Sequence, residues 1–92
     1  MNKIKEKIPM TEIMAGLAEE ASELAQAALK LRRVWDKTNP TPTPEDYALS
    51  SLYEEIADVQ LYISLRDLNH SAITSMMHEK MERWLKRLEE KK

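Results

Sequence analysis

Residues 11–36, TEIMAGLAEEASELAQAALKLRRVWD, decide the fold of this 92-residue chain. Apolar side chains recur in this stretch every three or four positions, at Met14, Leu17, Ala21, Leu24, Ala28, Leu31 and Trp35. That spacing places them on one face of an α-helix. We therefore expect a helix of about 39 Å, from Thr11 as its N-cap to Asp36.

The rest of the chain repeats this helical pattern. Glycine occurs once and phenylalanine not at all, and no β-branched or aromatic run bounded by turn residues predicts a strand. We expect a loose lead-in at 1–10, a helix at Thr11–Asp36 and a proline-rich loop at 37–43. Two more helices at Thr43–Leu68 and Ser71–Leu88 and a frayed tail at 89–92 would follow. We predict a single all-α domain. A helical hairpin plus a third helix would complete a four-helix-type bundle by oligomerisation.

Composition excludes several classes of function. The net charge of −2 gives no basic field for nucleic acid. No apolar run approaches the roughly 20 residues that span a bilayer, so we expect no membrane partner. The absence of cysteine rules out disulfides and thiolate metal sites, and it favours a cytoplasmic location.

Carboxylates are paired on the first two expected helices. Glu20 and Glu23 lie three positions apart, and so do Glu55 and Asp58. Residues with this spacing share one face of a helix. An antiparallel hairpin would bring the two pairs together, where mutual repulsion raises their pKa values unless a cation intervenes.

Two interpretations of these acids stay open from spacing alone. One is a divalent metal site, and all-oxygen ligands would then select Mg²⁺, Mn²⁺ or Ca²⁺. The other is an ordinary solvated face, on which acids pair with Lys or Arg one turn further along. No basic residue lies three or four positions after Glu20, Glu23, Glu55 or Asp58.

The two acidic motifs carry a resemblance to a known family. Glu19-Glu20-Ala21-Ser22-Glu23 on one helix and Glu55-Ile56-Ala57-Asp58 on the next resemble the MazG-like nucleotide pyrophosphohydrolases. The resemblance implies that Glu20, Glu23, Glu55 and Asp58 bind Mg²⁺, or Mn²⁺ in its place. Glu19 either orients or deprotonates the attacking water or is only a surface acid, and we favour the supporting role in catalysis. It also implies hydrolysis of a nucleoside triphosphate to monophosphate and pyrophosphate by a homodimer or homotetramer.

Several further residues are candidates for substrate binding. The family resemblance favours Lys80 and Arg83 as phosphate contacts, while a solvated basic face is the alternative. The other candidates are Lys30, Arg33 and Tyr62. Gly16 lies one turn before Glu20, and its missing side chain would leave space for a nucleotide or for a neighbouring helix.

Two other functions compete with this one. The apolar stripes could serve a non-catalytic helical interaction module, whose acids would stay solvated. The chain could also hydrolyse a different pyrophosphate-containing metabolite. Trp35 and Trp84 extend the apolar stripes, so we expect both to be packing residues.

Overall fold

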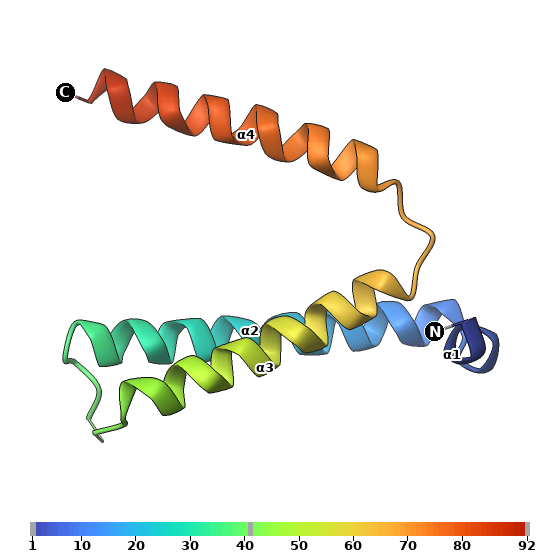
Figure 1. Cartoon of the computed structure of the whole chain (residues 1–92), viewed down its shortest axis with the longest axis horizontal. Coiled ribbons are helices and arrows are strands. Elements are labelled where there is room, and N and C mark those ends of the chain that lie inside the picture. Colours follow the sequence, from blue (N-terminus) through green and yellow to red (C-terminus); the bar gives the residue numbers. More distant parts are fainter. Residues whose placement is uncertain (1, 41, 92) are drawn as a thin grey trace.

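The computed structural model describes residues 2–40 and 42–91 (Figure 1). Its elements are four helices, namely α1 (Asn2–Lys7), α2 (Met10–Trp35), α3 (Glu45–Ser64) and α4 (His70–Glu90). No strand occurs within these described ranges. The prediction of an all-α class is therefore confirmed.

Helices α2 and α3 form an antiparallel hairpin that contains the whole buried core of the described chain. Ile13 and Leu65 are buried at one end, where α2 begins and α3 ends. Leu31 and Ala48 are buried at the other end. Apolar side chains on the facing sides between these ends, such as Leu24, Leu52 and Ile56, are only half-buried, because two helices cover just one side of each other.

The connection between α2 and α3 is held by its own polar groups. Lys37 adopts a left-handed conformation with φ of 62°, which turns the chain at the end of α2. The amide of Thr38 then donates to the carbonyl of Arg33 at 2.9 Å. Further along, Asn39 Nδ2 donates to Thr43 Oγ1 at 3.1 Å. The loop thus closes on itself before α3 begins.

The helix ends differ from the expected positions. Residues 2–7 of the expected lead-in form the short helix α1, and the expected tail is helical as far as Glu90. Helix α3 ends at Ser64, four residues before the expected end, because the chain turns where Leu65 is buried. Helix α4 is capped by Asn69, whose side chain accepts a hydrogen bond from the Ala72 amide at 2.9 Å.

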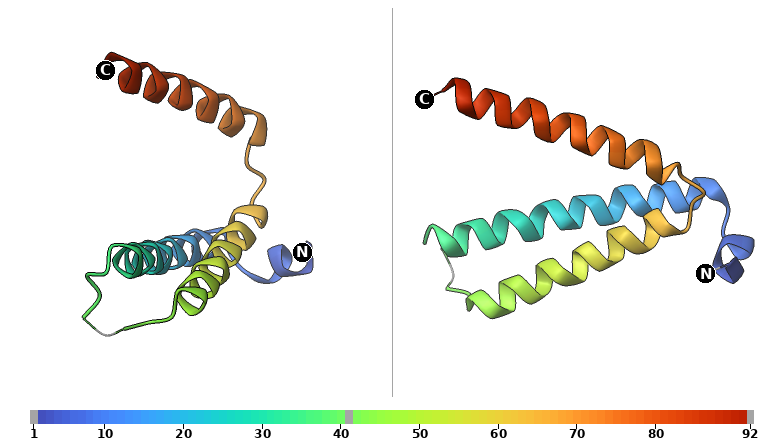
Figure 2. Two further views of the ribbon diagram at one scale, coloured as in Figure 1. Left: turned by 60° about the vertical axis from the view of Figure 1, so that its left-hand side comes forward. Right: turned by 45° about the horizontal axis from the view of Figure 1, so that its top comes forward.

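Helix α4 diverges from the hairpin after the linker at residues 65–69 (Figures 1 and 2). None of its described residues is buried. Trp84 is 61% exposed, and Trp35 at the end of α2 is exposed to the same extent. The expectation that both tryptophans pack is therefore not met within one chain, because no second layer of helix covers them.

None of the described helices combines the length and the apolar character that a bilayer crossing requires.

Candidate metal centre

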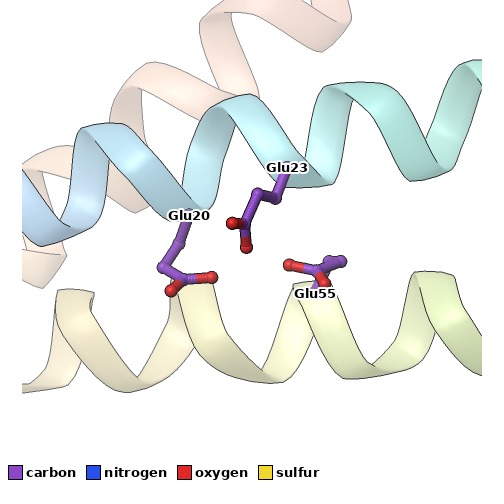
Figure 3. Close-up of side chains that lie close together, drawn as sticks. All are labelled: Glu20, Glu23 and Glu55. Carbon is purple, nitrogen blue, oxygen red and sulfur yellow. The ribbon is translucent and has the colours of Figure 1, made fainter.

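Three carboxylates meet in the middle of the hairpin (Figure 3). Glu20 and Glu23 project from α2 towards α3, and Glu55 projects from α3 towards them. One oxygen from each lies within 4.8 Å of the others. The spacing of three residues on α2 and the antiparallel pairing of the helices produce this convergence.

The cluster leaves buried oxygens without partners. Glu20 and Glu55 are half-buried, and Glu23 is exposed. The Oε2 atoms of Glu20 and Glu55 are shielded from solvent and accept no hydrogen bond from the described residues. Such atoms lose their hydration without gaining a protein partner. A ligand that supplies positive charge would satisfy them.

Repulsion and burial change the acidity of the cluster. The pKa of Glu20 is raised to about 7, first by burial, then by a side-chain hydrogen bond with Glu23 and by repulsion from Glu23, Asp58 and Glu55. The pKa of Glu55 is also raised, first by burial and then by repulsion from Glu23 and Asp58. No ion pair among residues 2–40 and 42–91 involves the three acids.

The other two predicted acids lie beside this group. Asp58 is half-buried and near enough to raise the pKa of both Glu20 and Glu55, but its oxygens are not among the three that converge. Glu19 is exposed on α2, where its backbone carbonyl accepts a hydrogen bond from Ser22 Oγ at 3.0 Å. The structure thus gathers three of the four predicted ligands and places the fourth next to them.

Gly16 of α2 and Tyr62 of α3 lie against each other across the hairpin. The two residues lie one helical turn from Glu20 and Asp58, respectively. The half-buried Tyr62 ring occupies the space above Gly16, so a Cβ atom on Gly16 would lie 2.6 Å from its Cζ. The glycine therefore makes room for the neighbouring helix, as one of the two expectations had it.

Substituting Gly16 by alanine should destabilise the chain by about 1 kcal/mol, because the cost of overpacking against the Tyr62 ring exceeds the gain in helix propensity. In a Tyr62→Ala background the clash is gone. There the same substitution should stabilise by about 1 kcal/mol, the helix propensity alone. Urea unfolding of the four proteins measures both values. The same sign in both backgrounds would show that the ring does not fill this space.

The predicted basic contacts lie away from the acids. Lys30 is exposed two turns beyond Glu23 on α2. Arg33 lines a shallow depression at the proline-rich loop. Lys80 and Arg83 are exposed on α4, where they line a basic depression with Lys86, Arg87 and Glu90. Within one chain, α4 does not bring these cations to the cluster.

One acid contributes to the electrostatics without having been assigned a role from the sequence. Glu54 is exposed, and its charge also raises the pKa of Glu55. Its position directly before Glu55 in the sequence is the signal from which this electrostatic effect could have been predicted. It lies on the outer side of α3, so it increases the negative potential without offering a ligand to the cluster.

The donors suit a hard divalent cation. Carboxylate oxygens without thiolate or imidazole select Mg²⁺, Mn²⁺ or Ca²⁺. A group of three ligand atoms leaves coordination positions for water and for phosphate oxygens, as Mg²⁺ prefers. The Oε2 atoms of Glu20 and Glu55, which are shielded from solvent and have no hydrogen-bond partner, are suited to bind such an ion.

Comparison of the chain with known protein families, with curated proteins and with solved structures finds no match.

Proposed function

We propose that this chain is a Mg²⁺-dependent nucleoside triphosphate pyrophosphohydrolase that works as a homo-oligomer in the cytoplasm. The observation that carries the proposal is the meeting of Glu20, Glu23 and Glu55, two of which hold shielded oxygens without a partner. The resemblance of the two acidic motifs to the MazG-like family supplies the reaction. Mn²⁺ would replace Mg²⁺ with the same ligands.

The reaction adds water across the bond between the α- and β-phosphates and yields a nucleoside monophosphate and pyrophosphate. A bound Mg²⁺ would neutralise the charge of the triphosphate and lower the pKa of the attacking water. Glu20, Glu23 and Glu55 would hold the ion, and Asp58 would complete the ligand set when it turns towards them. Glu19, exposed beside Glu20, would orient the water.

The remaining predicted residues would serve the substrate. Tyr62 would close one side of the site, and Lys30 and Arg33 would attract the phosphates along α2. Lys80 and Arg83 would reach the phosphates only in an assembly, because α4 stands apart from its own hairpin. This requirement supports a homodimer or homotetramer with sites between subunits.

A panel of ribo- and deoxyribonucleoside triphosphates tests the proposal, with pyrophosphate release as the readout. We expect turnover of at least one nucleotide with Mg²⁺ and none in excess chelator. The panel also includes pyrophosphate-linked metabolites that are not nucleoside triphosphates. These compounds distinguish the proposed enzyme from a related hydrolase that acts on a different pyrophosphate-containing metabolite. Release from such a compound alone would contradict the nucleotide assignment.

A non-catalytic interaction module is the second candidate. The observation that favours it is the exposure of large apolar side chains along α4, among them Met81, Trp84 and Leu88. Such a module would tolerate neutral replacements in the acidic cluster. The substitutions in the Discussion therefore distinguish the two functions.

A further inference from the structure

A single chain leaves far more surface exposed than a compact protein of its size. Its accessible surface is 7777 Å², whereas a folded monomer of 10.7 kDa exposes about 5,500 Å². Its radius of gyration is 17.1 Å, against about 12 Å expected for this length. The excess is about 2,300 Å² per chain. The divergent helix α4, which has no buried residue, is its main visible source.

One face of α4 is continuously apolar. Ile73, Met77, Met81, Trp84 and Leu88 follow one another at intervals of three or four, and their exposed fractions run from 40% to 61%. The last three, together with Leu85, line a shallow depression. Monomeric proteins seldom leave an apolar face of this length uncovered. The face therefore indicates an interaction surface.

Helix α2 carries a second uncovered apolar face with matching spacing. Met14, Ala18, Ala21, Ala25 and Ala28 are all exposed and follow at intervals of four and three. The same alternation links Met77, Met81, Trp84 and Leu88 on α4. It is the spacing of helices that pack along a shared seam. Small side chains on one helix and large ones on the other fill such a seam without voids.

We propose that α4 of one chain packs its Met77–Leu88 face against the Met14–Ala28 face of α2 in a second copy of this chain. A two-fold pair satisfies both faces of both chains at once, because each chain carries the two complementary halves. The excess surface of two copies is about 4,500 Å², within the 2,000–5,000 Å² or more that permanent homodimers bury. This packing of α4 against α2 of a second chain does not depend on the proposed catalytic activity.

Cysteine cross-linking tests the pairing, since the chain has no cysteine of its own. An Ala25→Cys chain and a Met81→Cys chain, given different affinity tags, are co-expressed and treated with a short bis-maleimide. We expect a covalent dimer carrying both tags as the main product. Predominant dimers with one tag, or no dimers, would overturn the proposal. So would a double variant, Ala25→Cys with Met81→Cys, that closes within one chain, because α4 would then fold onto its own hairpin.

Sedimentation of the full chain gives an independent readout. We expect the wild type to be a dimer or larger, and Trp84→Glu to shift the population towards monomer by at least about tenfold in Kd. Lys86→Glu is the matched control on the opposite side of α4, and it should leave the assembly unchanged. Circular dichroism of both variants verifies that the helices remain. A monomeric wild type, or a Trp84→Glu variant that assembles normally, would refute the interface.

Discussion

Replacing Glu55 by glutamine should lower pyrophosphate release from a nucleoside triphosphate at least about 100-fold. Glutamine keeps the size of the side chain, but it removes one of the three charges that meet at the hairpin centre. The amide would also present a donor to a cation in one of its two orientations. The measurement is kcat and KM with saturating Mg²⁺.

Glu54→Gln is the control for that substitution. It is the same chemical change one residue earlier, on a side chain that is exposed and outside the cluster. We expect its kcat to stay within about twofold of the wild type, because a surface charge is largely screened. A Glu55→Gln protein as active as Glu54→Gln would exclude a catalytic metal at this cluster and favour the interaction module.

Magnesium should raise the Tm more at pH 8 than at pH 5.5. The pKa of Glu20 rises from 4.5 to about 7 on folding, so the protonated form is favoured in the folded state. Its contribution to stability is therefore complete below about pH 4.5 and is lost as the pH rises through about 7. Mg²⁺ would bind the ionised cluster, which is populated above that range, and a hundredfold excess over Kd should raise the Tm by roughly 10–20 °C.

Glu20→Gln should remove both the loss of stability at pH 8 and most of the rise in Tm that Mg²⁺ causes. Without divalent ions at pH 8 it should melt at a higher temperature than the wild type, because one repelling charge is gone. With Mg²⁺ its Tm should rise little. Asp36 and Asp67 do not disturb the comparison, since their pKa values are lowered from 3.8 and their contributions change only at more acidic pH. Equal Mg²⁺ shifts at both pH values would contradict a metal bound by ionised Glu20.

The hairpin and most of its acidic cluster could be predicted from the sequence because both depend on local rules. The interval between Glu20 and Glu23 fixes their common face on α2, and the proline-rich loop forces the chain to reverse. Glu55 then meets them because α3 is antiparallel and packs through its own apolar stripe. Asp58 obeys the same rule but stays at the edge, since its shorter side chain reaches less far than a glutamate.

The remaining features depend on contacts between distant residues. Lys5 Nζ donates a hydrogen bond to Asp67 Oδ1 at 2.7 Å across 62 positions, which ties α1 to the linker after α3, and no periodicity signals such a pair. The Tyr62 ring fills the space over Gly16 only because of the way α3 crosses α2. Neither the hydrophobic periodicity nor the helix caps predict the direction of α4, because its apolar face is not buried against any described part of the chain.

The acidic cluster lies near the middle of both hairpin helices, about 18 Å along α2 from the turn that follows Trp35. Fraying at the helix ends therefore does not reach it, and no described residue of the connecting loop contributes one of its oxygens. Lengthening that loop changes only the entropy of closing the chain, which grows slowly with length. The loop between residues 36 and 44 is thus a place where segments of new sequence could be inserted while the chemistry at the centre stays intact.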